Sequence, residues 1–376
     1  MMRAVAEIDL DALEHNLRVV REAAPGSMLL AVVKADAYGH GLVPIAQAAR
    51  AAGADWLGVA LLSEAVALRE SGDDGPLLAW LWTPGDPDLL ACVTARVQIS
   101  VSSLWALIAV VEAAAEAGVV ARVHLKLDTG LSRNGSDIEA WHELVTAAAA
   151  LKARGRIEVV GIWSHLADAA SGDAASVAQQ RTLFLQGVAQ AREAGIEPQL
   201  LHLANSAAAL TWPDTRFDLV RIGIAMYGVS PMEPASAQRF GLRAVMTLRA
   251  RLALVKTIPA GQSVSYGGLW TAVEPTRVGL VPLGYADGIP RIGRGAHVLV
   301  GGVRCAVLGQ IAMDQFVIEL PAELESVEAG DEVIVFGDAA TGAPTADDWG
   351  TWSGSIGYEI VTRLGARVPR AYERRA

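Results

Sequence analysis

The stretch MLLAVVKADAYGHG, residues 28–41, places a lysine at the end of a short apolar run. Runs of the same kind recur as far as residue 223, and their apolar, partly β-branched composition is typical of buried strands. The later runs are WLGVA (56–60), LLAWL (77–81), VQISV (97–101), ARVHLKLD (121–128), IEVVGIWS (157–164), QLLHLAN (199–205) and FDLVRIG (217–223).

Longer alanine-rich or amphipathic segments separate these runs, and Gly53, Gly118 and Gly195 follow the ends of three such segments. A glycine just past a helix supplies a left-handed cap that other residues adopt at a cost. Alternating strands and helices favour parallel strands with crossover helices. The pattern therefore predicts an α/β fold, a (β/α)8 TIM barrel. An open doubly wound sheet is the alternative, but no glycine-rich dinucleotide motif follows the first run.

The sequence changes character after about residue 240, where β-rich runs are separated by glycine and proline without long helical segments. This predicts a mostly β C-terminal domain over residues 241–376, after a barrel over residues 10–240. The opening run AVAEIDL also has strand character. We therefore expect the N-terminal segment 1–9 to join the second domain.

Composition narrows the classes of partner. Lysine plus arginine is 31 and aspartate plus glutamate is 41, which gives a formal net charge of −10. An acidic chain repels nucleic acid and anionic membranes, so neither is expected as a partner. The N-terminus lacks an uninterrupted apolar signal core, and the most apolar helical segment carries Glu112 and Glu116. The isolated Cys92 and Cys305 fit a reducing compartment, so we expect a cytoplasmic protein without a metal cluster.

Polar side chains end five of the eight predicted strands, on the barrel face where such enzymes place their chemistry. They are Lys34, Lys126 with Asp128, His165, Asn205 with Ser206, and Arg221. Burial and nearby cations would lower the pKa of Lys34 and make it a nucleophile or base. An interpretation with equal weight is that the Lys34 side chain only reaches from the strand end into water.

The other polar residues also have structural explanations. Arg221 can cap a strand or pair with Asp218, and Ser206 is first of all a helix N-cap. An N-cap at a barrel mouth can also bind phosphate. In the second domain, Tyr266 and Tyr285 stand beside glycines, where a tyrosine usually serves as an interface or rim residue.

The chain resembles the alanine racemases over nearly its whole length. The motifs that carry this resemblance are AVVKADAYGHG (31–41), HLKLDTGLSRNG (124–135), WSHLADA (163–169), HLANSAAAL (202–210), VRIGIAMYG (220–228), VSYGG (264–268), GYADGIPR (284–291), IAMDQ (311–315) and IGYEIVTRL (356–364). The resemblance implies a fold-type III enzyme that uses pyridoxal 5'-phosphate. It also implies a head-to-tail homodimer that interconverts L- and D-alanine and supplies D-alanine for peptidoglycan.

The resemblance also implies roles for individual residues. Lys34 would hold the cofactor covalently and act as one base, and Tyr266 of the partner subunit would be the opposed base. The cofactor would further contact Tyr38, His165, Asn205, Ser206, Arg221, Gly223, Ile224 and Tyr358. Arg133 and Met313 would contact the substrate, with Lys126, His202, Tyr285 and Asp314 in supporting or entrance positions. Lys126 matches a lysine that is carbamylated in many relatives.

Two positions depart from the family's usual motifs, and three other functions are alternatives to an alanine racemase. Ser132 stands where a glycine is usual before the arginine, and Trp270 stands where a tyrosine is common. A racemase of broader specificity, acting on serine or lysine, would share these motifs. A non-catalytic pyridoxal-phosphate carrier would share the lysine but not the long β domain. A metal-dependent barrel hydrolase using His124, His165 and His202 lacks an HxH pair or a carboxylate cluster.

Overall fold

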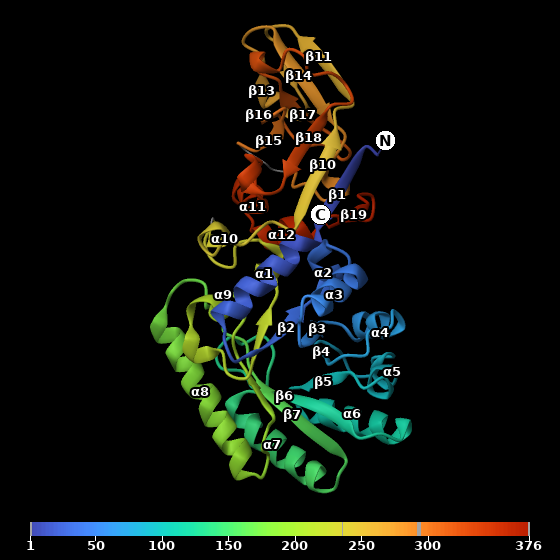
Figure 1. The fold of residues 1–376 in the computed structure, drawn as a ribbon, viewed down its shortest axis with the longest axis vertical. Coiled ribbons are helices and arrows are strands. Elements are labelled where there is room, and N and C mark those ends of the chain that lie inside the picture. Colours follow the sequence, from blue (N-terminus) through green and yellow to red (C-terminus); the bar gives the residue numbers. More distant parts are fainter. Residues whose placement is uncertain (1, 235, 292–294, 375–376) are drawn as a thin grey trace.

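The chain forms a barrel with a separate β-rich region beyond it (Figure 1). The computed structural model describes residues 2–234, 236–291 and 295–374. Among these described residues, no helix combines the length and the apolar character that crossing a membrane requires.

Eight parallel strands line the barrel in the order β8-β7-β6-β5-β4-β3-β2-β9. This order follows the chain except where β9 meets β2, whereas a doubly wound sheet reverses direction in its middle. At the remaining seam, the N–H groups of Asp218 and Arg221 donate to the carbonyls of Leu201 (3.1 Å) and Ala204 (3.0 Å). The predicted barrel is therefore confirmed. Its strands are β2 Met28–Val32, β3 Trp56–Val59, β4 Leu77–Ala79, β5 Gln98–Val101, β6 Ala121–Lys126, β7 Ile157–Trp163, β8 Leu200–His202 and β9 Leu219–Ile222.

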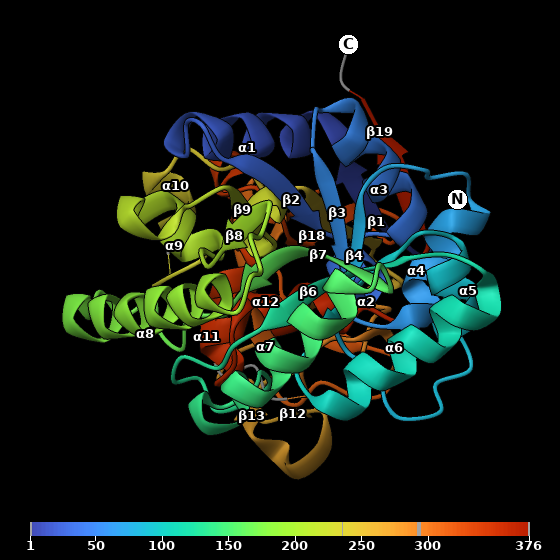
Figure 2. The ribbon, with the colours of Figure 1, turned by 90° about the horizontal axis from the view of Figure 1, so that it is seen from below.

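Helices pack around the outside of these strands, as the view from below shows (Figure 2). Gly53, Gly118 and Gly195 have φ of +88°, +68° and +87°, so each takes the left-handed conformation that the sequence predicted. The helices of this part are α1 Leu10–Ala23, α3 Leu42–Ala51, α4 Leu62–Glu70, α5 Leu89–Thr94, α6 Leu104–Ala117, α7 Ile138–Ala153, α8 Ala174–Glu193, α9 Ser206–Thr211 and α10 Ser236–Arg239.

The remaining strands form a mostly β region with a nine-stranded sheet, ordered β11-β14-β17-β16-β15-β18-β10-β1-β19. Strand β1 lies between β10, to which it is antiparallel, and β19, to which it is parallel. The N-terminal strand thus lies in the second sheet. The strands and helices of this β-rich region are β1 Ala4–Asp9, β10 Met246–Arg251, β11 Leu254–Ile258, β12 Ser263–Val264, β13 Trp270–Thr271, β14 Thr276–Val281, β15 His297–Val300, β16 Val303–Leu308, β17 Phe316–Glu319, β18 Glu332–Phe336, α11 Ala346–Ser353, α12 Gly357–Thr362 and β19 Arg370–Glu373.

The segment after β2 has an uncommon backbone. Within α2 (Lys34–Gly39), the four residues from Ala35 to Tyr38 have φ of +53° to +54° and ψ of +40° to +53°. These values describe one turn of left-handed helix, which costs L residues about 1–2 kcal/mol each. Neighbouring groups hold this turn, since Glu64 Oε1 accepts from the N–H of Ala35 (2.6 Å) and Asp36 Oδ1 accepts from that of Leu42 (2.7 Å).

Candidate active site

A cavity of about 660 Å³ opens at the C-terminal ends of the barrel strands. Most residues that the sequence singled out in the barrel line this cavity, although they are far apart in the chain. They are Lys34, Tyr38, Lys126, Arg133, His165, Asn205, Ser206, Arg221, Gly223 and Ile224, joined by Tyr358 from α12. Because parallel strands end at one rim, the fold brings these groups together.

Lys34 combines partial burial with cationic neighbours. Its ammonium lies 6.0 Å from the centre of the Tyr38 ring. Burial and the positive charge of Arg133 lower the pKa of Lys34, and the carboxylate of Glu64 opposes them in part. A larger fraction of this amine is therefore neutral than in a free lysine, which favours its use as a nucleophile or base.

Lys126 and Arg221 both pack against the ring of Trp163. The ammonium of Lys126 lies 4.3 Å from the ring centre and the guanidinium carbon of Arg221 lies 4.8 Å from it. Burial, together with Arg221 and Arg133, lowers the pKa of Lys126 to about 7. Trp163 also lines the cavity, and the sequence reasoning gave it no role although it stands in the motif WSHLADA.

Arg221 is buried and fixed by acceptors on several sides. Its Nη2 donates to the carbonyls of Ser164 (2.8 Å) and Leu203 (3.0 Å) and lies 3.3 Å from His165 Nδ1. Its Nη1 lies 3.3 Å from Nδ1 of His202. The ion pair with Asp218 that the sequence left open does not form, and the Asp218 carboxylate accepts from the Leu201 N–H (2.8 Å). Burial lowers the pKa of Arg221 to about 9.

One end of the cavity gathers hydroxyl and backbone N–H groups. Ser206 Oγ accepts from the N–H groups of Gly223 (3.0 Å) and Ala225 (3.4 Å). A Cβ at Gly223 would stand 2.4 Å from the Tyr38 hydroxyl, so only glycine allows this close approach. The expected N-cap role of Ser206 is wrong: Asn205 is the N-cap of α9, and its side chain accepts from the Ala208 N–H.

Apart from Tyr358, the predicted residues of the second region are not among those that line this cavity. Tyr266 is 71% exposed, and Tyr285, Met313 and Asp314 are also exposed. Asp287, two residues after Tyr285, is instead fully buried and pairs with Arg3 (2.6 Å) and Arg367 (3.3 Å). A single chain therefore presents the barrel part of the predicted site together with Tyr358, but without Tyr266 and Tyr285.

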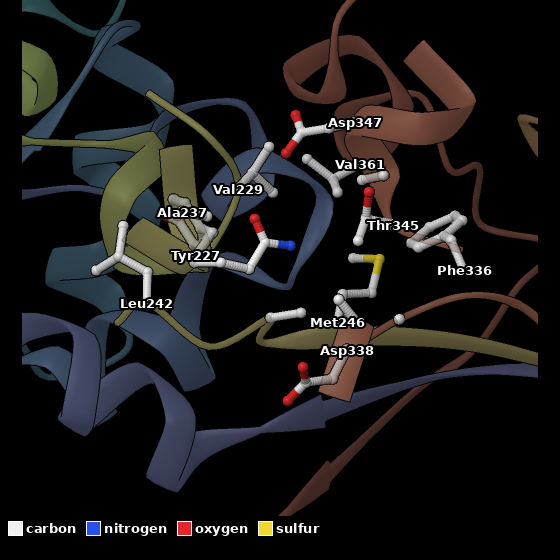
Figure 3. A pocket seen from close by; sticks show the side chains of 16 residues that line it. Tyr227, Val229, Ala237, Leu242, Met246, Phe336, Asp338, Thr345, Asp347 and Val361 are labelled. Carbon is white, nitrogen blue, oxygen red and sulfur yellow. The ribbon is translucent and has the colours of Figure 1, made fainter. Parts of the chain in front are cut away.

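Two further observations bear on the alternatives. Within residues 2–234, 236–291 and 295–374, no three histidine, cysteine, aspartate or glutamate side chains form a group that could hold a metal ion. A second cavity, lined by residues such as Tyr227, Val229, Met246 and Asp347, lies between the barrel and the second sheet (Figure 3). It measures about 30 Å³, which is room for about one water molecule and too little for a substrate.

Comparison with known proteins gives a consistent result over the whole chain. Residues 8–231 match the family model "Alanine racemase, N-terminal domain", and residues 245–372 match "Alanine racemase, C-terminal domain". The alanine racemase of Streptomyces coelicolor is 54% identical over 379 residues, covering 99% of this chain and 96% of that protein. The one from Beutenbergia cavernae is 50% identical, with coverages of 98% and 97%.

Solved structures agree with these sequence relatives. The alanine racemase from Streptomyces lavendulae has a TM-score of 0.97 at 51% identity, covering 100% of this chain and 98% of its own. A Bacillus anthracis alanine racemase with bound L-Ala-P has a TM-score of 0.89 at 33% identity, covering 100% and 96%. With both family models matching and about half of all residues identical to the two Streptomyces proteins, the chain belongs to the alanine racemase family.

Proposed function

We propose that this chain is a pyridoxal-phosphate-dependent enzyme that interconverts L- and D-alanine as a homodimer. The observation that carries the proposal is the cavity that Lys34, with its lowered pKa, shares with hydroxyl groups and with the basic side chains Lys126, Arg133 and Arg221. The family that the chain belongs to supports alanine as the substrate. D-alanine for peptidoglycan is the corresponding product in the cell.

The cavity fits pyridoxal phosphate in its chemistry. The neutral fraction of Lys34 suits covalent attachment to an aldehyde. Tyr38, Ser206 and Tyr358, with the backbone of Gly223 and Ile224, would hold the phosphate. The glycine at position 223 supports this role, because a Cβ there would stand 2.4 Å from the Tyr38 hydroxyl and would push it away from this backbone. Arg221 would donate to the pyridine nitrogen. When bound, the cofactor withdraws electrons from the α-carbon of the amino acid.

The protein would contribute two opposed proton carriers. Racemisation removes the α-proton on one face and returns a proton on the other, so a base and an acid are needed on opposite sides. Lys34 would serve one face, and Tyr266 of the partner subunit the other. The 71% exposure of Tyr266 leaves it free to enter a neighbouring cavity. Arg133 and Met313 would contact the substrate carboxylate, with His165 near Tyr266 and with Tyr285 and Asp314 at the entrance.

The division into domains supports this arrangement. We propose a cofactor-binding barrel over residues 10–240 and a C-terminal domain over residues 241–376 that includes the strand of residues 1–9. The pairing of β1 with β10 and β19 supports the last point.

A racemase of broader specificity for serine or lysine is the second candidate, since the open side of the cavity does not limit side-chain length by itself.

Complementation between two inactive variants tests the proposal. Lys34→Ala and Tyr266→Phe should each abolish alanine racemisation as separate homodimers. In a mixed dimer, one of the two sites keeps both native residues, so co-expression should restore about a quarter of wild-type activity. No recovery in isolated mixed dimers would contradict the shared site.

The substrate and the cofactor are tested side by side. L-alanine, L-serine and L-lysine are assayed at equal concentrations with wild-type enzyme, and alanine should racemise fastest. The cofactor should give visible absorbance that borohydride fixes to Lys34 and that Lys34→Ala lacks. Bound cofactor without racemisation of any of the three would identify a carrier instead.

A further inference from the structure

A row of hydrogen-bonded polar side chains crosses the interior of the barrel behind Arg221. Gln98 on β5, His124 on β6 and His202 on β8 are each at most 1% exposed. Gln98 Oε1 lies 2.8 Å from His124 Nε2, and His124 Nδ1 lies 2.9 Å from His202 Nε2. The other nitrogen of His202 faces Arg221 Nη1 at 3.3 Å. We call these four residues the relay.

The chemistry of arginine sets the direction of every bond in the relay. A guanidinium has five N–H donors and no acceptor. Arg221 therefore donates to Nδ1 of His202, which leaves the proton of that ring on Nε2. That proton is donated to Nδ1 of His124, whose own proton is then on Nε2 and is donated to Gln98 Oε1. Only one tautomer of each histidine satisfies all three contacts.

Both imidazoles are neutral in this arrangement. Burial, with Arg122 and Arg221 nearby, lowers the pKa of His124 to about 3. Burial, His124 and Arg221 lower the pKa of His202 well below its ordinary value. A neutral imidazole has one donor and one acceptor, so each ring accepts one hydrogen bond and donates one to the next residue of the relay.

A glycine on the intervening strand makes the relay possible. His124 on β6 reaches His202 on β8 across β7, where residue 161 is glycine. A Cβ at Gly161 would stand 2.4 Å from Nδ1 of His124, the atom that accepts from His202. Gly161 does not have the positive φ that would itself require glycine. The missing side chain is thus explained by the space that the His124 ring needs.

Barrel interiors are usually filled by branched apolar side chains, and buried polar groups persist there only when they are satisfied. We propose that Gln98 and His124 are positioning residues: they hold His202 in the tautomer that accepts from Arg221, and so keep the guanidinium directed into the cavity. The statement that Arg221 there meets the pyridine nitrogen rests on the proposed function.

The tautomers can be observed directly. Wild-type enzyme labelled with ¹⁵N at histidine should show, for both His124 and His202, a protonated Nε2 and a bare Nδ1, with and without cofactor. Gln98→Glu keeps an oxygen acceptor and should preserve this pattern. Gln98→Met has a similar shape without the acceptor, and it should mix the His124 tautomers. Gly161→Ala should displace the His124 ring and break its contact with His202.

Cofactor affinity supplies a second readout. Titration of cofactor-free enzyme should give similar dissociation constants for wild type and Gln98→Glu. Gln98→Met and Gly161→Ala should bind pyridoxal phosphate about five- to tenfold more weakly, the factor expected from one buried hydrogen bond. If Gln98 only filled space, the methionine variant would match wild type in both measurements.

Two results would overturn the relay. One is a proton on Nδ1 of His202 in the wild-type enzyme, a measurement that needs no variant to fold. The other is wild-type cofactor affinity in Gln98→Met with unchanged tautomers. The predicted tautomers in an enzyme that bound no pyridoxal phosphate would support the relay and contradict the proposed function, so the two failures are distinct.

Discussion

Replacing Ala35 with glycine tests the strain in the left-handed turn after β2. Ala35 has φ +54° and ψ +53°, and its side chain is exposed, so the substitution removes no buried surface. Glycine relieves a left-handed cost of about 1–2 kcal/mol. It also adds freedom to the unfolded chain, which offsets about 0.4–1 kcal/mol of that gain. We expect Ala35→Gly to stabilise the protein by about 0.5–1 kcal/mol.

The control is an exposed alanine with ordinary helical geometry. Ala178 lies within α8 (Ala174–Glu193) and its side chain is exposed. Ala178→Gly should destabilise the protein by about 1 kcal/mol, because glycine is a poor residue for a right-handed helix interior. The same chemical change should therefore have opposite signs at the two positions.

The assay is urea unfolding of the cofactor-free enzyme, which removes any contribution of bound cofactor through the neighbouring Lys34. Turnover of the cofactor-loaded enzyme is measured in parallel, and Ala35→Gly should lower kcat because a glycine gives Lys34 a less rigid support. A loss of stability in Ala35→Gly as large as that in Ala178→Gly would refute the strain argument.

Three further predictions concern stability. Ser132 has φ +56°, so Ser132→Gly should raise the free energy of unfolding by about 0.5–1 kcal/mol, and a lowered urea midpoint would contradict this. The pKa of Lys126 is lowered to about 7 by burial, so above that pH the unfolded chain binds a proton that the folded chain lacks. Stability in CO2-free buffer should rise between about pH 7 and 10, and rise less in Lys126→Met; equal slopes in the two proteins would count against it. Asp287 is buried against two half-exposed arginines, so Asp287→Ala should cost about 2–3 kcal/mol by urea unfolding, and a neutral result would show that the pairs add nothing.

The sequence predicted the barrel part of the site because strand ends are readable from it. An apolar run followed by a polar residue marks where a parallel strand stops, and all such ends face the same rim. The strand ends therefore predict that Lys34, Lys126 and Arg221 meet at the mouth of the barrel, and all three line its cavity. The glycine caps were predictable for a similar reason, since a local conformation required them.

Other features depend on geometry that the sequence does not display. The turn at residues 35–38 reads ADAY and has neither glycine nor asparagine to mark a left-handed backbone. Gln98 was visible as a polar residue in an apolar run, but its partner depends on strand order and on the space beside Gly161. Asn205 and Ser206 are both good N-caps, and only the course of the loop decides between them.

The place of β1 in the second sheet has a consequence for synthesis on the ribosome. Its neighbours, β10 and β19, span residues 246–251 and 370–373, so its pairing partners are translated long after it. The barrel can close while both edges of β1 are still unpaired and exposed. Completion of the second sheet is therefore a late, non-local event. Strand β1 is synthesised first, but its backbone can pair only after β10 and β19 have been translated.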